Sequence, residues 1–349
     1  MHNKSAATAV APLLSLCIPT FNRSASVNRL VRSILACDTS DIEIIVSNNA
    51  SPDDTLDVLN ELADARLKIY SSSENQGALF NMLRALSLGT GKYVIYCTDQ
   101  DYFLANQLTE FLELLRHESQ ISCGFCLLPV DADRPTRTVP AGYDAMLAVA
   151  YRSRHPTGYF FRSEDLKAIG FPDKFSRFDE VELFPLEFVF AELALKGAAL
   201  IYRKGLFQPE VSKSVTEHKS STTDGKSKTA FFSPDSRLRM SIKFAKHLDR
   251  LTLSRFNAVR IESSVFLSGI WVSTVGYRSI MANEQLCAHY RMGVEKISVF
   301  QVIAMAARFT KRYFDRRRND KSPIILHALV ICCFAVSHLI SRVAQKIVT

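Results

Sequence analysis

Glycine, proline and tryptophan are all scarce in this 349-residue sequence, with 13 Gly, 12 Pro and a single Trp. So few glycines and prolines exclude collagen-like and low-complexity chains. Hydrophobic residues make up 47% of the chain and charged residues 22%, a balance that excludes a largely disordered protein. The mean hydropathy of +0.03 is low for a polytopic membrane protein. The length predicts one or two domains with a sizeable packed core.

The eight cysteines do not have the paired spacing of a structural zinc site. Cys123 and Cys126 have the spacing of half such a site, but no second pair follows. Most of the cysteines lie inside apolar runs, where a thiol behaves as a small hydrophobic group. We therefore expect reduced cysteines, a cytoplasmic setting and no secretory signal at the N-terminus.

The formal charge of +8 is unevenly distributed along the chain. Residues 1–202 contain 18 Lys and Arg against 25 Asp and Glu, a charge of −7, and residues 203–349 contain 25 against 10, a charge of +15. The basic part is typical of a chain that binds nucleic acid, an anionic membrane surface or an anionic substrate.

Strand-like and helix-like segments alternate four times in the first third of the chain. The strands are expected near residues 13–18, 42–47, 67–70 and 93–97, and the helices near 24–36, 55–65, 78–88 and 105–116. Apolar strands joined by helices predict an α/β fold with a parallel sheet that is covered on both faces. Because ligands bind beyond the carboxyl ends of such strands, we expect one polar edge formed by residues 19–23, 47–54, 73–77 and 99–101.

Three regions are expected along the chain: an N-terminal lead (1–12), an α/β domain (13–234) that ends in a mobile loop (208–234), and a basic helical region (235–349). The α/β domain continues with strands near 121–130, 158–162 and 198–202 and a helix over 184–196, whereas 131–157 looks loop-rich. Helices are expected near 235–249, 252–278, 295–314 and 323–346.

Asp99 and Asp101 flank a single residue at the end of a buried strand. Two carboxylates in this position can bind one Mg²⁺ or Mn²⁺ ion, which would bridge the phosphates of a nucleoside diphosphate and neutralise charge on it as it leaves. The alternative is a solvated turn in which an aspartate caps the next helix.

Four ordered motifs resemble those of family 2 glycosyltransferases: LCIPTFNR (16–23), EIIVSNNASPDDT (43–55), NQG (75–77) with Asn81, and GKYV (91–94) with TDQD (98–101). The resemblance covers roughly residues 13–115. It implies a GT-A fold, a nucleotide-sugar donor, a divalent cation and a transfer that inverts the configuration at the anomeric carbon. An alternative with the same architecture, a nucleotidyltransferase, is disfavoured because residues 19–23 contain no glycine.

The resemblance also implies roles for individual residues. Asn48 stands where the family usually has an aspartate that touches the nucleobase, and this leaves the identity of the base open. The alternative for Asn48 and Asn49 is a turn with positive φ angles. Asp101 would bind the metal. The nucleotide-sugar site would be formed by Pro19, Thr20, Asn22, Arg23, Asn48, Asn75, Gly77 and Asp99, the last of which faces the ribose or the metal.

An inverting transfer needs a general base, which the family places near the start of the helix that ends at Gly197. Spacing from Gly197 favours Glu187, with Asp179, Glu180 and Glu182 as rivals. The alternative for Glu187 is an exposed acid in the first helical turn, where the helix dipole favours negative charge. Glu192 is expected to be solvated.

Two histidines and a group of lysines have open roles. His155 either shapes an acceptor pocket or lies in a turn set by Pro156 and Gly158. His218 is a third metal ligand or phosphate contact by resemblance, or a solvated loop residue. The lysines of the polar loop either bind the diphosphate when the loop closes or only keep the loop soluble. They are Lys213, Lys219, Lys226 and Lys228.

The C-terminal region joins a basic run (311–321) to a nearly apolar segment (324–340). At 17 residues, the segment is shorter than the about 20 that a spanning helix needs. We expect a helix in or against an anionic leaflet, with a spanning or re-entrant helix and a buried bundle helix as alternatives. Nucleic acid is disfavoured as a partner because the basic run lacks spaced aromatic residues.

The leading hypothesis is an enzyme at the cytoplasmic face of a bacterial inner membrane, where it is peripherally bound. It would transfer a sugar to a lipid-linked or other glycan acceptor in O-antigen, capsule or exopolysaccharide synthesis. The alternative is a non-catalytic nucleotide- or glycan-binding module, which the intact Asp99 and Asp101 disfavour.

Overall fold

The computed structural model describes residues 11–128, 135–152, 155–176, 185–209, 233–289 and 292–317. The chain divides into two compact units. Unit 1 consists of Met1–Gly142, Ser153–Phe178 and Leu193–Val211, and unit 2 of Tyr143–Arg152, Asp179–Glu192 and Ser212–Thr349. The domain boundary at residue 234 remains a prediction.

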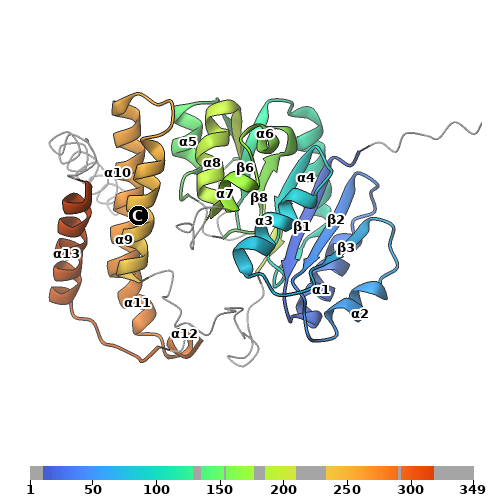
Figure 1. Ribbon diagram of the computed structural model, residues 1–349, viewed down its shortest axis with the longest axis horizontal. Helices are drawn as coiled ribbons and strands as arrows, with labels where there is room; N and C mark the ends of the chain where they lie inside the picture. Colours follow the sequence, from blue (N-terminus) through green and yellow to red (C-terminus); the bar gives the residue numbers. More distant parts are fainter. Residues whose placement is uncertain are drawn as a thin grey trace, which may run out of the picture. The chain divides into compact units, whose positions relative to one another are not determined.

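Unit 1 is built on an eight-stranded sheet with the order β3-β2-β1-β4-β8-β6-β9-β7 (Figure 1). Its first four strands in the chain are all parallel, which confirms the predicted sheet: β1 (Leu14–Thr20), β2 (Ile42–Asn48), β3 (Leu67–Ser71) and β4 (Tyr93–Tyr96). Two later strands run antiparallel to their neighbours, so that the sheet as a whole is mostly parallel. The later strands are β6 (Ile121–Cys126), β7 (Arg137–Val139), β8 (Tyr159–Arg162) and β9 (Ala198–Tyr202).

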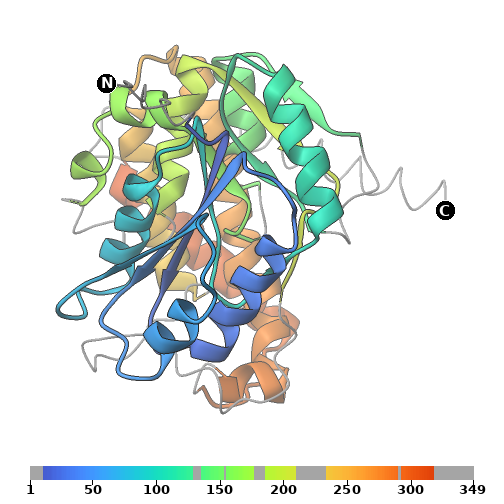
Figure 2. The same ribbon diagram turned by 90° about the vertical axis from the view of Figure 1, so that its right-hand side faces the viewer.

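Helices cover both faces of this sheet. The apolar stripes of α1 (Ser24–Leu35) and α4 (Ala105–His117) share one core with the alternate residues Leu14, Leu16 and Ile18 of β1. In Figure 2, the cyan helix α3 (Ala78–Leu88) lies on the opposite side of the strands from the blue α1 and the teal α4. Burial on both faces explains why β1 and β2 are apolar along most of their length.

The strand register brings the carboxyl ends of the parallel strands to one edge. Thr20 at the end of β1 pairs with Asn48 at the end of β2, and Asn48 pairs with Ser71 at the end of β3. On the other side of β1, Cys17 pairs with Tyr96 at the end of β4. The predicted polar edge is therefore present.

Several short elements were not predicted. The antiparallel pair β5 (Tyr102–Phe103) and β10 (Phe207–Gln208) joins segments about a hundred residues apart, which no local pattern reveals. Unit 1 also contains α6 (Ser163–Ala168) and α7 (Asp173–Ser176). Helix α5 (Tyr143–Val149), which belongs to unit 2, lies in a region expected to be loop-rich. Helix α2 (Thr55–Asn60) is shorter than predicted, because Ala63 adopts a φ of 43°, which helical backbone does not allow.

Unit 2 contains the C-terminal helices, and no strand occurs in the described residues 233–289 and 292–317. Ser233 and Ser254 cap the first two helices through their hydroxyl oxygens. The predicted helix 252–278 contains a π-helical turn, and the predicted helix 323–346 lies outside the described residues. The helices are α9 (Pro234–Leu248), α10 (Arg255–Trp271), the π-turn η2 (Val272–Gly276), α11 (Tyr277–Met281), α12 (Glu284–His289) and α13 (Val299–Arg317).

A buried ion pair fastens the end of α13 to α10. Arg317 is 2% exposed, and its Nε lies 2.9 Å from Oε1 of Glu262. Its Nη1 lies 2.8 Å from Oδ2 of Asp249, and Glu262 also accepts a hydrogen bond from the hydroxyl of Tyr313. Arg317 belongs to the basic run (311–321), which we expected beside an anionic leaflet. For this residue the expectation is wrong, because its charge is neutralised inside unit 2.

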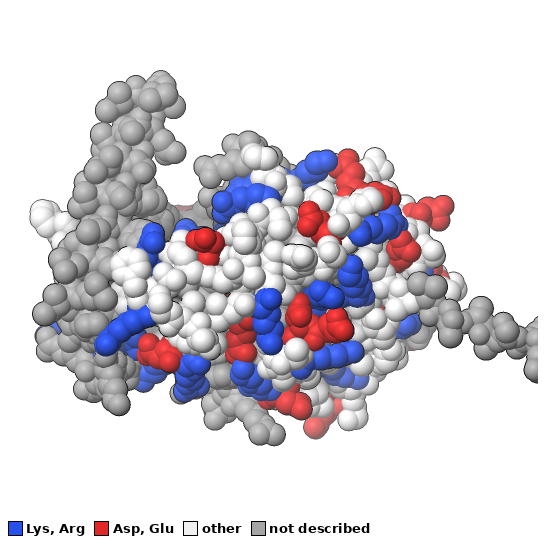
Figure 3. All heavy atoms as spheres, turned by 90° about the horizontal axis from the view of Figure 1, so that it is seen from above, with Lys and Arg blue, Asp and Glu red and all other residues white. Residues whose placement is uncertain are grey.

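Surface charge is mixed on the face that Figure 3 shows. Lys and Arg side chains lie interspersed with Asp and Glu side chains there, and the described residues of this face form no single-sign patch. On this face, the described residues therefore form no basic surface of the kind that binds nucleic acid, although the charge is uneven along the sequence.

Glu43 on β2 is a buried carboxylate with a full set of donors. Its Oε1 accepts hydrogen bonds from Ser15 Oγ and Thr90 N, both at 2.6 Å, and its Oε2 lies 2.6 Å from Nζ of Lys68. Burial acts to raise the pKa of Glu43, but the hydrogen bonds from Lys68, Ser15 and Thr90 outweigh it and lower the pKa below its ordinary value.

Glu43→Gln is expected to lower the free energy of unfolding by about 1–3 kcal/mol at neutral pH, because the charged acceptor is lost. Since the folded-state pKa lies below the unfolded one, this difference is fully present above the unfolded pKa and shrinks as the pH falls through the folded pKa. Urea unfolding at neutral and acidic pH measures it, with Glu61→Gln at an exposed acid as the control. A difference that does not change with pH would contradict the role given to the charge.

Candidate active site

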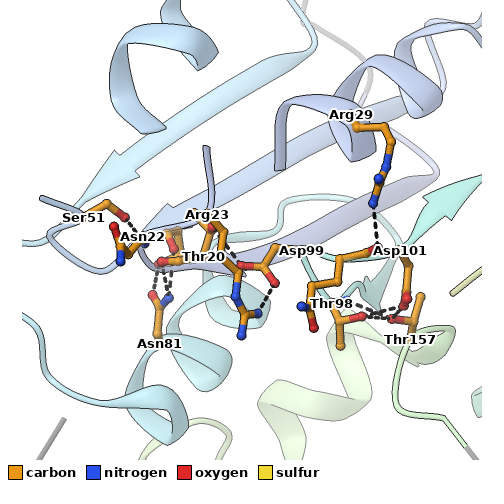
Figure 4. A network of polar contacts seen from close by, with 12 residues as sticks. Thr20, Asn22, Arg23, Arg29, Ser51, Asn81, Thr98, Asp99, Asp101 and Thr157 are labelled. Carbon is orange, nitrogen blue, oxygen red and sulfur yellow. Dashed lines mark hydrogen bonds and ion pairs between the residues drawn. The ribbon is translucent and has the colours of Figure 1, made fainter. Parts of the chain in front are cut away.

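Asp99 and Asp101 lie directly after β4 and are both buried, at 3% and 2% exposure. Asp99 is tied to the end of β1 by two contacts (Figure 4). Thr20 Oγ1 donates a 2.9 Å hydrogen bond to its Oδ2, and Nη1 of Arg23 lies 2.6 Å from its Oδ1. Two neighbouring strand ends thus hold one carboxylate between them.

The charge of Asp99 is only partly compensated by these contacts. Burial raises the pKa of Asp99 and the nearby Asp101 adds to the rise, while Arg23 and the Thr20 hydroxyl oppose it. The raised pKa means that the contacts of Asp99 do not fully offset the free energy needed to bury its negative charge. A bound cation would offset the rest, which agrees with the cation predicted for two carboxylates at a strand end.

Asp101 is held through one of its two carboxylate oxygens. Its Oδ2 accepts hydrogen bonds from the hydroxyls of Thr98, at 2.5 Å, and Thr157, and His155 Nε2 lies 2.8 Å from the same atom. Its Oδ1 has no hydrogen-bond partner among the residues that the structure describes. The carboxylate is therefore fixed in orientation, with one oxygen left to bind a ligand.

The ends of β1 and β2 are joined by the buried side chain of Asn81 on α3. Its Nδ2 donates to the carbonyl oxygens of Thr20, at 3.2 Å, and Ser47, at 2.9 Å, while Ser47 Oγ donates back to Asn81 Oδ1 at 2.7 Å. These backbone groups lie at the end of the sheet ladder and need side-chain partners. Asn81 thus holds the ends of β1 and β2 together at the polar edge.

Asn48 and Asn49 hold the loop that follows β2. Asn48 Nδ2 donates to Ser71 Oγ at 3.3 Å, and its Oδ1 accepts from the backbone N–H of Ser51 at 3.1 Å. Asn49 Nδ2 donates to Oδ1 of Asn75 at 2.7 Å. The alternative of positive φ at Asn48 and Asn49 is wrong, because the left-handed residues of these loops are Asn22 (φ 56°) and Ala50 (φ 58°).

The structure brings the predicted nucleotide-site residues together at one edge of unit 1. Backbone N–H groups complete the arrangement: that of Asn22 donates to Ser51 Oγ at 2.9 Å, and that of Gly77 to Asn75 Oδ1 at 2.9 Å. Gly77 has a φ of 90°, which a side chain would strain. The residues of this edge are Pro19, Thr20, Asn22, Arg23, Asn48, Asn75, Gly77, Asp99 and Asp101. Their roles in binding remain predictions.

Glu187, the predicted general base, lies in the first turn of α8 (Pro185–Lys196) and belongs to unit 2. It is 2% exposed, and its Oε2 accepts a 2.7 Å hydrogen bond from the backbone N–H of Tyr151. The alternative of an exposed acid is therefore wrong. Glu192 is also buried rather than solvated, with Oε1 3.3 Å from Nε2 of His247. Both acids are buried because most of α8 is apolar and enclosed on every side.

Several predicted residues fall outside the described part of the chain. They include the rival bases, the predicted third metal ligand and the lysines of the polar loop. These residues are Asp179, Glu180, Glu182, His218, Lys213, Lys219, Lys226 and Lys228.

Sequence analysis missed the partners of Asp101. Thr157 and His155 follow Asp101 by more than fifty residues and reach it because β8 lies beside β4 in the sheet. In the sequence His155-Pro156-Thr157-Gly158 they look like parts of a turn, and Gly158 does adopt a φ of 91°. The only available signal was a polar His and Thr directly before an apolar strand.

The carboxylates fit a cation that completes its coordination with ligands from outside the protein. No group of three or more His, Cys, Asp or Glu side chains among the described residues is arranged to hold a metal ion. Mg²⁺ is commonly bound by one or two carboxylates together with substrate phosphates and water, and Mn²⁺ accepts similar oxygen ligands. Oδ1 of Asp101 and the partly compensated Asp99 match that pattern.

The mostly parallel sheet, with helices on both faces, defines an α/β domain of the GT-A type. Residues 15–176 match the family model for glycosyl transferase family 2. These residues are therefore similar to that family, which confirms the resemblance for this part of the chain.

Curated relatives match part of the chain. The β-1,3-glucosyltransferase of Campylobacter jejuni that is described as acting on GalNAc(5)-diNAcBac-PP-undecaprenol is 32% identical over 120 residues, which are 34% of this chain and 39% of that protein. The Escherichia coli glucosyltransferase WfaP is 26% identical over 106 residues, 30% of this chain and 42% of that protein. The chain thus spans about two fifths of the length of these relatives.

The fold is similar to that of a solved structure over most of the chain. The crystal structure of Staphylococcus aureus TarS 1–349 superposes with a TM-score of 0.57 and covers 93% of this chain and 91% of that one. At 14% sequence identity, this similarity concerns the fold alone. It confirms an α/β domain of the GT-A type followed by a helical region.

Thr157→Val is expected to lower the free energy of unfolding by about 1–3 kcal/mol, because the buried Asp101 loses a hydrogen-bond donor. Thr157→Ser, which keeps the hydroxyl, should lose much less. Urea unfolding of the two variants and the parent chain measures the effect. An unchanged free energy of unfolding in Thr157→Val would contradict the role of the hydrogen bond, and so would a loss in Thr157→Ser as large as that in Thr157→Val.

Proposed function

We propose that this chain transfers a sugar from a nucleotide-sugar to an acceptor hydroxyl. The observation that carries the proposal is the pair of buried carboxylates, Asp99 and Asp101, at the carboxyl edge of a parallel sheet, within the residues that match the family 2 model. Ligands of open α/β sheets bind at this edge. A non-catalytic binding module is the alternative, and it gives no reason to keep two buried acids oriented for a cation.

The nucleotide is proposed to lie across the ends of β1, β2 and β3. Arg23 and Thr20 would position Asp99 beside the ribose or the metal. Because both polar groups of Asn48 already have protein partners, we propose that Asn48 shapes the base pocket through the loop it holds. The remaining walls of the nucleotide site would be formed by Pro19, Asn22, Asn75 and Gly77.

A divalent cation, Mn²⁺ or Mg²⁺, is proposed to bind Asp101 through Oδ1, with Asp99 beside it. When bound, it would neutralise the charge that develops on the leaving diphosphate. Thr98, Thr157 and His155 would act as positioning residues, since they hold Oδ2 and so set the direction of Oδ1. His218 would supply a further ligand.

Glu187 is the proposed general base, with Asp179 and Glu180 as rivals. A base takes the proton from the acceptor hydroxyl as the sugar is transferred with inversion. The support within the chain is a buried carboxylate whose Oε2 is anchored by the N–H of Tyr151, which fixes its orientation.

The acceptor is proposed to be a lipid-linked glycan used in surface-polysaccharide synthesis. Two relatives carry diphosphoundecaprenol acceptors in their descriptions, and TarS was crystallised with UDP and with UDP-GlcNAc. We therefore place UDP-sugars first among the donors, and the enzyme at the cytoplasmic face of a bacterial inner membrane. None of the described helices is long and apolar enough to cross a bilayer.

Asp101→Ala is expected to reduce sugar transfer at least about 100-fold under Mn²⁺, because the oriented carboxylate is lost from the site of the leaving group. A screen of UDP-, CDP-, GDP- and dTDP-sugars first identifies the donor, and turnover is then measured for both proteins. Asp54→Ala, at an exposed acid on the same loop edge, is the control and should keep the parent rate. Undiminished transfer by Asp101→Ala would refute the metal role.

Glu187→Gln is expected to lower turnover by about 10²–10⁴-fold while leaving thermal stability nearly unchanged. The amide oxygen of Gln can still accept the hydrogen bond from Tyr151 N, but it cannot take a proton. Turnover and melting temperature are measured together. If the variant melts at the parent temperature and turns over at the parent rate, Glu187 is not the base, and Asp179, Glu180 or Glu182 takes its place in the proposal.

A further inference from the structure

Exposed apolar side chains are concentrated in one part of unit 2. Of the ten large hydrophobic residues that are exposed in the described chain, eight belong to unit 2. Five of these lie within residues 286–303, from α12 to the first turns of α13: Leu286, Val294, Val299, Phe300 and Ile303. A soluble protein rarely leaves so many apolar side chains exposed over a short segment unless they meet another surface.

Helix α13 has two faces of different character. Its inner face is fixed, because Phe309 and Tyr313 pack on Phe266 and Arg317 joins the buried ion pair. On its outer face, Phe300 is 84% exposed, Ile303 60% and Val299 56%. The inner contacts prevent the helix from rotating to bury these residues, so their exposure is built into unit 2.

The outer face changes from apolar to basic along the helix. Residues spaced three or four apart share a face, which places Lys311 in line with Phe300, Ile303 and Ala307, and Arg308 beside them. Arg308 and Lys311 are exposed. No acidic residue occurs between Glu295 and Asp315. Exposed apolar side chains and exposed cations on one side of a helix supply the two contributions that hold a helix at a membrane interface, namely buried apolar area and attraction to anionic lipids.

We propose that this face of α13, the membrane strip (Val299, Phe300, Ile303, Arg308 and Lys311), docks on an anionic lipid bilayer. The apolar side chains would enter the headgroup region, and the two cations would contact lipid phosphates. The proposal rests on the proposed function, since an enzyme that uses a lipid-linked acceptor has to work at a bilayer surface.

Charge argues for lipid over a second copy of this chain. Packing the strip against itself would bring Arg308 and Lys311 of two chains together, with no acidic residue inside the strip to pair with them. A bilayer that contains anionic lipid supplies both the apolar layer and the negative charge. Nucleic acid supplies the charge but gives Phe300 and Ile303 no apolar layer to enter.

The test is flotation of the full chain with vesicles of phosphatidylglycerol and phosphatidylcholine in equal parts, and with phosphatidylcholine alone. The parent chain is expected to float with the anionic vesicles. Phe300→Ser combined with Ile303→Ser should reduce the floating fraction about tenfold or more. The matched control is Phe256→Ser, which removes an exposed phenylalanine of the same unit on α10 and should float like the parent.

A second measurement keeps the proposal testable if the serine variant is poorly behaved. Phe300→Trp should be quenched by lipids brominated in the acyl chain, and Phe256→Trp should not. Trp271, the native tryptophan, is common to both proteins and gives the background signal. Unchanged flotation of the serine variant, or no quenching of Phe300→Trp, would overturn the proposal. Self-association in solution that Phe300→Ser with Ile303→Ser abolishes would overturn it in favour of a second copy.

Two controls separate this proposal from the proposed function. Asp101→Ala should lose sugar transfer and still float, whereas the serine variant should transfer sugar to a water-soluble acceptor at the parent rate. If the parent chain floats and does not transfer sugar, the proposed function fails and the membrane strip stands.

Discussion

The parallel run of β1 to β4 is the constraint on which the rest of unit 1 depends. It brings four strand ends to one edge, where backbone groups and carboxylates are left without sheet partners. Asp99 and Asp101 are stable there because neighbouring segments supply donors to each: Thr20 and Arg23 from the first strand and its loop, and Thr157 and His155 from the segment before β8. The same contacts leave one oxygen of Asp101 for a ligand.

Local signals in the sequence predicted most of this edge. The helix expected at 78–88 is found at Ala78–Leu88, and the strands that carry the polar ends begin within a residue of their expected positions. These elements are coded by apolar periodicity and by turn residues next to them. The partners of Asp101 were not predictable in this way, because they meet it only through the antiparallel insertion of β8 beside β4.

Buried charges were the other class of error, and they have one physical origin. Glu192 and the basic run that contains Arg317 were expected at the surface, and exposure was the alternative given for Glu187, because an isolated charge avoids an apolar interior. Each is buried, and the interaction that compensates it comes from a distant segment: the N–H of Tyr151, the ring of His247, and the carboxylates of Glu262 and Asp249. Such pairs depend on the packing of helices, which neighbouring residues in the sequence do not reveal.

The central claim is that the strand-end carboxylates hold a cation against a nucleoside diphosphate. Anomalous scattering from Mn²⁺ in crystals grown with Mn²⁺ and the diphosphate of the preferred donor tests it most directly. The expected result is one strong peak within coordination distance of Asp101 Oδ1 that also contacts diphosphate oxygens. A diphosphate bound at the strand ends without a peak at Asp101, or a peak at another site, would contradict the claim.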